Sequence, residues 1–185
     1  MEPNNIRYKI DRNNILFDIE GAWEEFATKN GAKNGLFRNE VLGKNLLDFI
    51  TGEETRYLYE VIFTRLRSHP RTVVLPFRCD APDRRRFLEL TITPIGNGGL
   101  QLASRLLREE MREEIRFLRG DIPRSEEVLP ICSVCKKIRV SPNEWLEAEE
   151  AVVHLRIFEK EVQPRLSHGL CPSCYRQAMD SLGVK

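Results

Sequence analysis

The stretches ICSVCKKIR at 131–139 and SHGLCPSC at 167–174 each contain one Cys-x-x-Cys pair. The four cysteines of the two pairs are Cys132, Cys135, Cys171 and Cys174. A structural zinc site takes four tetrahedral ligands, and one Cys-x-x-Cys pair supplies two thiolates at a spacing that suits a single metal ion. The two pairs therefore predict one structural Zn²⁺ site, around which the C-terminal part of the chain is organised.

The composition is that of a globular chain with balanced charge. The 185 residues include 29 basic and 28 acidic side chains, and the formal charge of +1 gives no global attraction to nucleic acid or to membranes. The sequence has no apolar run of about 18 residues, which a membrane span needs, and its first residues, MEPNNIRYKID, do not resemble a signal peptide. We therefore expect a cytoplasmic protein with no membrane contact, in which cysteine pairs indicate metal or redox chemistry rather than disulfides.

Residues 1–107 predict a small α+β domain. Two short strands near the N-terminus precede a longer helix, whose start is indicated by the capping-box spacing from Thr51 to Glu54. Apolar residues then alternate with polar ones over 73–79 and 88–92. Together with a glycine-rich turn and one further apolar stretch, this alternation predicts three antiparallel strands.

This order of elements, with the motif GKNLLDFI at 43–50, resembles that of PAS domains over about residues 5–107. The resemblance implies a five-stranded antiparallel sheet with helices on one face. It also implies a pocket between them that either holds an unidentified small ligand or is filled by side chains. His69 stands before Pro70 and is expected in a surface loop rather than as a haem ligand, while Cys79 is expected to pack as a small apolar residue.

Residues 108–126 predict a helical linker that Gly120 and Pro123 bring to an end. Apolar residues recur at steps of four, four and three, as on one face of a helix. These residues are Leu107, Met111, Ile115 and Leu118. One interpretation is a solvated helix packed on its own domain. The other, which is favoured, is a parallel helix pair that forms a homodimer and carries a signal out of the PAS-like domain.

Residues 127–185 predict a small module held together by the zinc ion. Ser141 and Glu144 have the spacing of a helix start, and 175–182 predicts a closing helix, so a treble-clef-like or ribbon-like zinc module is expected. The basic residues placed to offset the charge of four thiolates are Lys136, Lys137 and Arg139.

The sequences CSVCKKIR and SHGLCPSC resemble a short C-terminal module of bacterial signalling proteins, which often follows PAS or receiver domains. The resemblance covers about residues 129–178 and implies no activity. His168 stands within it, next to the second pair. It could replace a cysteine or donate a hydrogen bond to a sulfur, and with four cysteines present a supporting or purely structural role is favoured.

Three functions remain open. The first is a non-enzymatic signalling protein, in which a PAS-like domain is coupled to a structural zinc module that contacts an unknown signalling partner. The second is a thiol redox switch or oxidoreductase that uses the Cys-x-x-Cys pairs. The third is a nucleic-acid-binding regulator. From Glu126 to Lys185 there are eight basic and nine acidic residues, and this balance argues against a phosphate-binding face.

Overall fold

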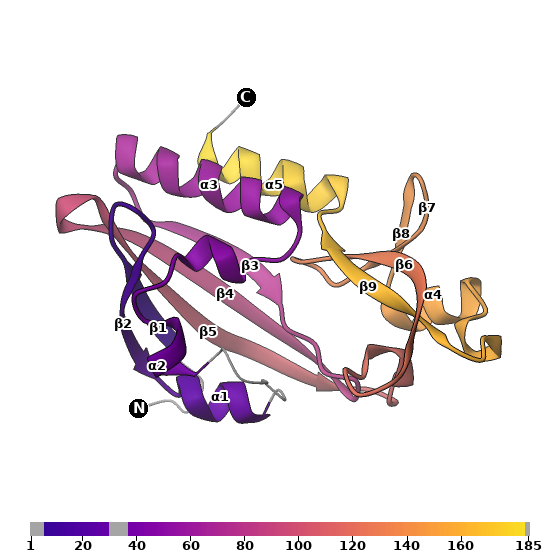
Figure 1. Ribbon diagram of the computed structural model, residues 1–185. Coiled ribbons are helices and arrows are strands. Elements are labelled where there is room, and N and C mark those ends of the chain that lie inside the picture. The colour runs from indigo at the N-terminus through magenta and orange to yellow at the C-terminus, as the bar shows by residue number, and fades with distance from the viewer. Residues whose placement is uncertain (1–5, 30–36, 184–185) are drawn as a thin grey trace.

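The computed structural model describes residues 6–29 and 37–183 and forms them into two sheets with helices around them (Figure 1). The larger sheet has the strand order β2-β1-β5-β4-β3, and all its neighbouring strands are antiparallel. Its strands are β1 (Ile6–Ile10), β2 (Leu16–Gly21), β3 (Val73–Arg78), β4 (Arg84–Ile95) and β5 (Gly99–Met111). The five-stranded antiparallel sheet that was predicted is therefore confirmed.

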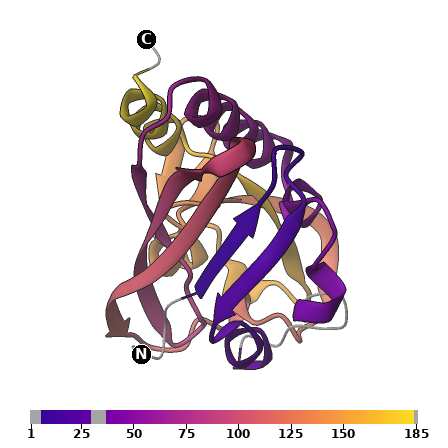
Figure 2. The same ribbon diagram turned by 90° about the vertical axis from the view of Figure 1, so that its left-hand side faces the viewer.

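Two helices lie side by side across one face of this sheet (Figures 1 and 2). They are α3 (Glu53–Ser68) and the C-terminal helix α5 (Pro172–Leu182). The shorter elements before α3 are α1 (Trp23–Lys29), α2 (Arg38–Val41) and the 3-10 helix η1 (Leu46–Phe49). A one-turn 3-10 helix, η2 (Gly96–Gly98), joins β4 to β5. The cover of the sheet thus combines an early and a late part of the chain.

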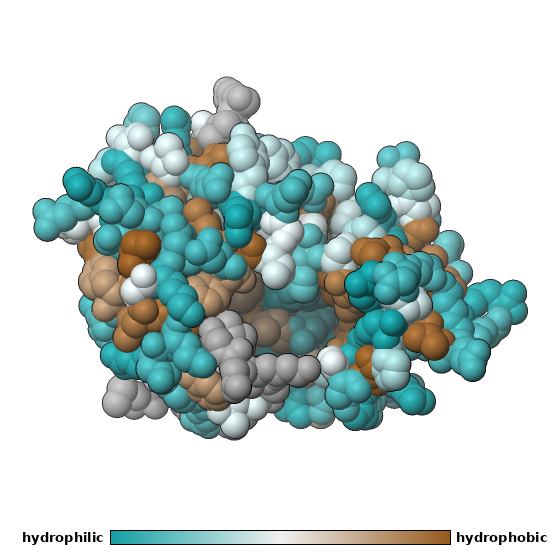
Figure 3. Space-filling view, viewed as in Figure 1, coloured by the Kyte–Doolittle hydropathy of each residue, from teal (hydrophilic) through white to brown (hydrophobic). Residues whose placement is uncertain are grey.

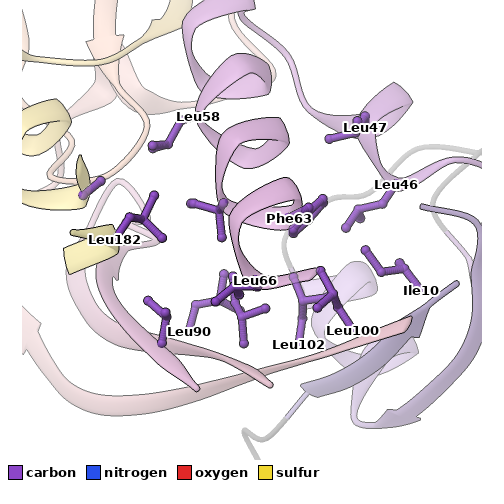
Figure 4. Close-up of a cluster of buried hydrophobic side chains, with 14 of the residues drawn as sticks. Ile10, Leu46, Leu47, Leu58, Phe63, Leu66, Leu90, Leu100, Leu102 and Leu182 are labelled. Carbon is purple, nitrogen blue, oxygen red and sulfur yellow. The ribbon is translucent and has the colours of Figure 1, made fainter. Parts of the chain in front are cut away.

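The main core lies between these helices and the sheet. Leu58, Ile62 and Leu66 follow the spacing of four residues that keeps side chains on one helical face, and all three are buried. They pack against alternating inward residues of the strands, such as Leu90 on β4 and Leu102 on β5. Figure 4 shows Leu58, Leu66, Leu90 and Leu102 gathered along α3. The period of two in the strands and of four in the helix therefore selects which residues form the core.

The second sheet is smaller and has the strand order β8-β7-β6-β9. Its strands are β6 (Arg124–Cys132), β7 (Ile138–Ser141), β8 (Glu144–Leu146) and β9 (Gln163–Gly169). β6 pairs with β9 in parallel, and the remaining pairs are antiparallel. Parallel strands need a long crossover, which here contains β7, β8, the helix α4 (Ala148–His154) and the 3-10 helix η4 (Ile157–Glu159).

The helical linker predicted over 108–126 is wrong. β5 continues to Met111, and the next regular element is the 3-10 helix η3 (Arg116–Leu118). Leu107 is exposed on β5, whereas Ile115 is buried in the core of the second sheet, so the apolar residues of this segment do not share one face. A homodimer through a pair of linker helices therefore has no helix to form it, and the oligomeric state stays a prediction.

The charges of this segment explain the difference. Arg and Glu placed three residues apart suit a helix, but the same residues can also pair across antiparallel strands. The carboxylate of Glu109 lies 3.1 Å from Arg84 and 3.1 Å from Arg86, both on β4. Cross-strand pairing with three consecutive arginines of β4 thus draws the segment into the sheet.

The helix predicted to start at Ser141 begins later than expected. Ser141 pairs with Glu144 across the turn between β7 and β8. α4 instead begins after Glu147, which is its N-cap, and the side chain of Glu150 accepts a hydrogen bond from the backbone N–H of Glu147. The closing helix predicted over 175–182 is confirmed, because α5 spans these residues.

The two parts of the chain meet along one continuous seam. The seam comprises α3, β3, residues 132–134, residues 168–170 and α5. Along it, the backbone N–H of Arg78 donates to the carbonyl oxygen of Val134 at 2.7 Å. The hydroxyls of Thr55 and Ser133 lie 2.9 Å apart and share a hydrogen bond. Independent folding of residues 1–107 and 127–185 stays a prediction, but in the full chain they are joined by direct contacts.

The seam also belongs to the main core. The buried cluster under α3 includes Cys132 of β6, Cys171 and Cys174 of the second pair, and Ala178 and Leu182 of α5. Figure 4 shows Leu182 extending from α5 into the same cluster of side chains as Leu66 and Leu90. Apolar surface of the larger sheet is therefore removed from water by residues that come much later in the sequence. Burial of apolar surface is the dominant favourable contribution to folding.

Buried ion pairs join the far end of the larger sheet to the second sheet. Arg78, whose side chain is nearly buried, pairs with Asp80 and reaches Glu147 at 2.7 Å. Arg112, equally buried, lies 3.1 Å from Glu149 and 3.4 Å from Asp80. Removal of one partner from such a group leaves an uncompensated buried charge, which is strongly destabilising. The group thus fixes α4 against the ends of β3 and β5.

The surface in Figure 3 is mostly hydrophilic and is hollowed between the larger sheet and the second sheet. Exposed large apolar residues include Phe17 on β2, Met111 at the end of β5 and Phe158 in η4, which belong to three separate elements. Among residues 6–29 and 37–183, no helix has both the length and the apolar character to cross a membrane.

Replacement of Gly52 tests how closely α3 approaches the second part of the chain. Gly52 has a φ of 91°, and a Cβ atom added there would collide with the carbonyl oxygen of His168. We expect Gly52→Ala to lower the free energy of unfolding by more than about 2 kcal/mol, because a left-handed backbone alone costs an alanine about 1–2 kcal/mol and the collision adds to this. Urea unfolding of the full chain measures the loss.

Two other glycines separate the cost of the left-handed backbone from the cost of the collision with His168. Gly43 has a φ of 81° with no atom within 4 Å of an added Cβ, so Gly43→Ala should show only the backbone cost. Gly96 has neither feature, and Gly96→Ala should be neutral or slightly stabilising. Equal losses in the Gly43 and Gly52 variants would contradict the close approach of Gly52 to His168.

Candidate metal centre

The four cysteines of the two pairs come together at the seam. Cys132 ends β6 and Cys135 lies in the turn before β7, whereas Cys171 is the N-cap of α5 and Cys174 lies in its first turn. The four Sγ atoms all lie within 4.8 Å of one another, and all four cysteines are free. We call this group the cysteine cluster. The four residues predicted as ligands are thus brought together, and metal binding by them stays a prediction.

A tight turn shapes the first pair. The backbone N–H of Lys136 donates to the carbonyl oxygen of Cys132 at 3.0 Å, and the N–H of Cys132 donates to the carbonyl oxygen of Lys137 at 2.8 Å. Lys136 has a φ of 62°. Residues other than glycine adopt this left-handed backbone conformation uncommonly, and surrounding contacts must hold them in it. This turn brings Cys135 back toward Cys132 instead of letting β6 run on.

The parallel pairing of β6 with β9 positions the second pair. Cys132 is in register with Gly169, and the backbone N–H of Ser133 donates to the carbonyl oxygen of Gly169 at 2.9 Å. The chain then turns into α5, and the N–H of Cys171 points at the sulfur of Cys132 at 3.4 Å. The register of two strands, set by residues before each pair, therefore fixes the distance between the pairs.

The geometry of the cluster fits a tetrahedral metal ion. Zinc–sulfur bonds of about 2.3 Å in a tetrahedron place neighbouring sulfurs about 3.8 Å apart. The sulfurs of Cys135 and Cys171 are separated by 3.7 Å, and the limit of 4.8 Å on all six separations lies close to this value. A disulfide would require a sulfur–sulfur distance of about 2.05 Å. The arrangement suits a shared metal ion better than a disulfide within either cysteine pair.

The thiols influence one another because they occupy one small volume. The pKa of Cys132 is lowered, because its sulfur accepts hydrogen bonds from Cys135 and Cys174. The same interaction with Cys132 raises the pKa of Cys135 to about 12 and also raises that of Cys174. One thiolate is therefore favoured and additional thiolates are opposed. A divalent cation among the sulfurs removes this opposition, so the donor set suits a metal ion.

Of the three basic residues predicted to offset the negative charge of the thiolates, Lys136 is the one whose side chain lies within the turn of the first pair. Its ammonium group donates to the carbonyl oxygen of Ser133 at 3.0 Å, within the turn of the first pair. Burial lowers the pKa of this ammonium group, and the negative groups around it, among them Cys132, oppose the shift. Lys137 contributes its backbone carbonyl to the turn, and Arg139 is exposed on β7.

The remaining candidate residues lie outside the cluster. His168 is exposed on β9, and within residues 6–29 and 37–183 its ring makes no hydrogen bond to a sulfur, so of the roles considered for it a purely structural one remains. His69 is exposed just after α3, as predicted. Cys79 is half-buried after β3 and is not one of the clustered cysteines.

Sequence reasoning missed Glu54. Its predicted role was to cap α3, but the N-cap of α3 is Gly52 and the Glu54 carboxylate instead accepts a hydrogen bond from the backbone N–H of Leu170 at 2.8 Å. Leu170 immediately precedes Cys171. Glu54 therefore holds the backbone of the second pair against α3. Its carboxylate also lies within 3.0 Å of where a Cβ of Gly169 would stand, which favours glycine there.

Comparison with known proteins gives limited information. No protein-family model matches the chain, and no curated protein matches it either. Among solved structures, a domain of an HTR-like protein from Haloarcula marismortui is similar over 56% of this chain and 98% of that domain. Its sequence identity is 11% and its TM-score is 0.35. The proposed function therefore rests on the geometry of the sheet and of the cysteine cluster.

Metal content is the direct test of the cluster. We expect elemental analysis to find about one zinc ion per chain in protein purified anaerobically without a metal-binding tag. Cys132→Ser and Cys171→Ser should lose it, because each removes one of four thiolates. Cys79→Ser makes the same chemical change outside the cluster and should keep the metal. Full metal content in all three variants, or none in the unmodified protein, would contradict a metal site at these cysteines.

Removal of Glu54 tests its support of the second pair. We expect Glu54→Ala to speed the loss of zinc to a chelator by about 10–100-fold, which is typical of groups that orient metal ligands, because the N–H of Leu170 loses its acceptor. Glu54→Gln keeps an acceptor oxygen and should retain metal better. Glu53→Ala, an exposed glutamate in the same helical turn, is the matched control. Equal rates for Glu53→Ala and Glu54→Ala would show that the contact does not matter.

Proposed function

We propose that this chain is a non-enzymatic sensory and signalling protein of the cytoplasm. In this proposal, a PAS-like sheet receives a signal and a structural zinc module presents it to a partner protein. Cys132, Cys135, Cys171 and Cys174 are the proposed zinc ligands. An unidentified signalling partner also belongs to the proposal, and so does a homodimer, which would form through a surface other than the linker helices expected from the sequence.

The sheet supports the sensory half of the proposal. Its five antiparallel strands with helices on one face agree with the arrangement that a PAS domain would have. In the strand order β2-β1-β5-β4-β3, the first strand of the sheet in sequence, β1, pairs with the last, β5.

The cluster supports a structural rather than a catalytic metal ion. Four thiolates complete a tetrahedral shell, whereas catalytic zinc keeps one position open for water or substrate. Three of the four cysteines are buried and Cys135 is half-buried. A bound zinc ion would supply charge neutralisation and a crosslink, and soft thiolate ligands favour zinc over magnesium or calcium. The residues of the cluster themselves orient the backbone of β6 and the start of α5.

One observation carries the proposal: the helix that starts at the second cysteine pair lies on the sensory sheet. α5 begins directly after Cys171, packs beside α3 and ends with Leu182 in the main core. A metal ion held by the cluster would thus fix part of the cover of the larger sheet. A shift of α3 would be passed to the second pair through Glu54, and from there to β9 and the second sheet.

A thiol redox switch is the second candidate. The lowered pKa of the Cys132 thiol favours it, because thiolates are the species that react with oxidants and disulfides. A zinc ion would protect the same sulfurs. The redox function therefore requires that the cluster cycles between dithiol and disulfide, with release of any bound metal.

Hydrogen exchange with and without metal separates these functions. We expect removal of zinc from the full chain to reduce amide protection in α5 and α3 and at the facing ends of β6 and β9, because these elements share the seam. The hairpin of β1 and β2 should change little, since it lies away from the seam. The measurement is made in a glutathione buffer at a reducing, cytosol-like ratio, with intact mass read in parallel.

Two results would oppose the proposal. Exchange that changes only within the two Cys-x-x-Cys pairs would show that the metal does not hold the cover of the sheet. Disulfide formation in the reducing buffer, with metal loss and an otherwise unchanged exchange pattern, would favour the redox switch instead.

A further inference from the structure

A cavity of about 80 Å³ lies within the seam, beside the cysteine cluster. Its walls come from α3, β3 and β4 on one side and from the first cysteine pair and α5 on the other. Its lining includes Leu58, Ile62, Val134 and Ala178, together with Cys174 of the cluster and Ser133 between the cysteines of the first pair. The pocket expected from the PAS resemblance would lie within residues 5–107, whereas this cavity requires both parts of the chain.

The residues that line the cavity disfavour a charged ligand. Of the described residues around the cavity, none is Asp, Glu, Lys, Arg or His, and most are aliphatic or aromatic. Tyr59 is neutral at physiological pH, as an ordinary tyrosine is, and burial raises its pKa further to about 12. A charged ligand would lose hydration here without an oppositely charged Asp, Glu, Lys, Arg or His side chain in the lining, and this is costly. The cavity therefore suits an uncharged molecule with an apolar body.

A few polar groups could orient such a molecule. Thr55 and Ser133 share one hydrogen bond of 2.9 Å, which leaves their hydroxyls with further capacity to donate or accept. On α5, the hydroxyl of Ser181 donates to the carbonyl oxygen of Gln177 and keeps its acceptor positions. Binding sites commonly combine an apolar lining with a small number of placed polar groups. One hydroxyl or amide on the ligand would be satisfied by these residues.

The size of the cavity limits the ligand. An engineered apolar cavity of about 150 Å³ in another protein binds benzene, and this cavity has about half that volume. It is also partly open to solvent, so a polar end can remain near water. These dimensions match an apolar body of roughly three to five carbons.

We propose that the seam cavity binds a small uncharged molecule with a short apolar body and one hydroxyl or amide group. The inference rests on the proposed sensory function for its biological meaning and gives that function a ligand class and a place. Because Ser133 and Cys174 line the cavity, a molecule inside it contacts the same backbone that shapes the cysteine cluster.

The test uses three probes of nearly equal shape on the full chain with its metal content measured. They are 1-butanol, n-butylammonium and butyrate, which differ in charge. Methyl NMR follows the leucine, isoleucine and valine side chains, of which Leu58, Ile62 and Val134 line the cavity. We expect saturable shifts of these methyl groups with 1-butanol, with a dissociation constant on the order of millimolar, and no saturable shifts with either charged probe.

A matched pair of variants places the binding site. Ala178→Leu puts three additional carbons into the cavity and should abolish the saturable shifts caused by 1-butanol. Ala103→Leu makes the same change on β5, where residue 103 lies on the opposite face of the sheet from the buried Leu102, and should leave binding unchanged. Both variants are compared with the unmodified chain for folding by their methyl spectra.

Several results would overturn the inference. These are shifts that rise linearly without saturation, equal binding of the charged probes, or undiminished binding by a folded Ala178→Leu variant. The probe series on the unmodified chain decides the matter even where Ala178→Leu does not fold. Absence of 1-butanol binding in a zinc-containing chain would overturn the ligand site and leave the proposed zinc module intact. Binding by an unmodified chain that contains no zinc as purified would leave the ligand site intact and contradict the proposed zinc module.

Discussion

The hydrogen bond from Leu170 to Glu54 and the close contact of Gly52 with His168 hold the second cysteine pair against the first turn of α3. The rest of the structure depends on this attachment. It sets where β9 ends, and thereby where α5 begins and along which line it crosses the sheet. A helix start usually satisfies its own N–H groups with nearby side chains, but here the first-turn carboxylate serves a strand that is distant in sequence.

The two attachments of the second sheet differ in their physics. At the seam, apolar burial and backbone hydrogen bonds dominate, with the cysteine cluster among them. At the far end, Arg78 and Arg112 form buried ion pairs with carboxylates of α4 and its N-cap. Apolar contacts tolerate small sliding movements, whereas buried charges need their partners at fixed distances. The second sheet is therefore attached by two different kinds of interaction, one at α4 and one at the seam.

The sequence was informative where a pattern had one physical reading. Alternation over 73–79 and 88–92 predicted strands, and the spacing within the cysteine pairs predicted that four sulfurs would meet. The segment after Leu107 was misjudged because alternating Arg and Glu satisfy both a helix and a paired strand. The role of Glu54 could not be foreseen, since its partner lies 116 residues away and is a backbone N–H that carries no sequence signal.

The position of α5 in the core has a consequence for how the chain is made. α5 is synthesised after every other element described, so the strands of the larger sheet are complete while Leu182 and Ala178 are still missing from the cover. During that interval, apolar surface of β3 and β4 is open to water and to chaperones. The first cysteine pair is also synthesised before the second, so at that stage only two of the four sulfurs of the cysteine cluster are present. Completion of the core and completion of the cysteine cluster are thus the same late event in the life of each molecule.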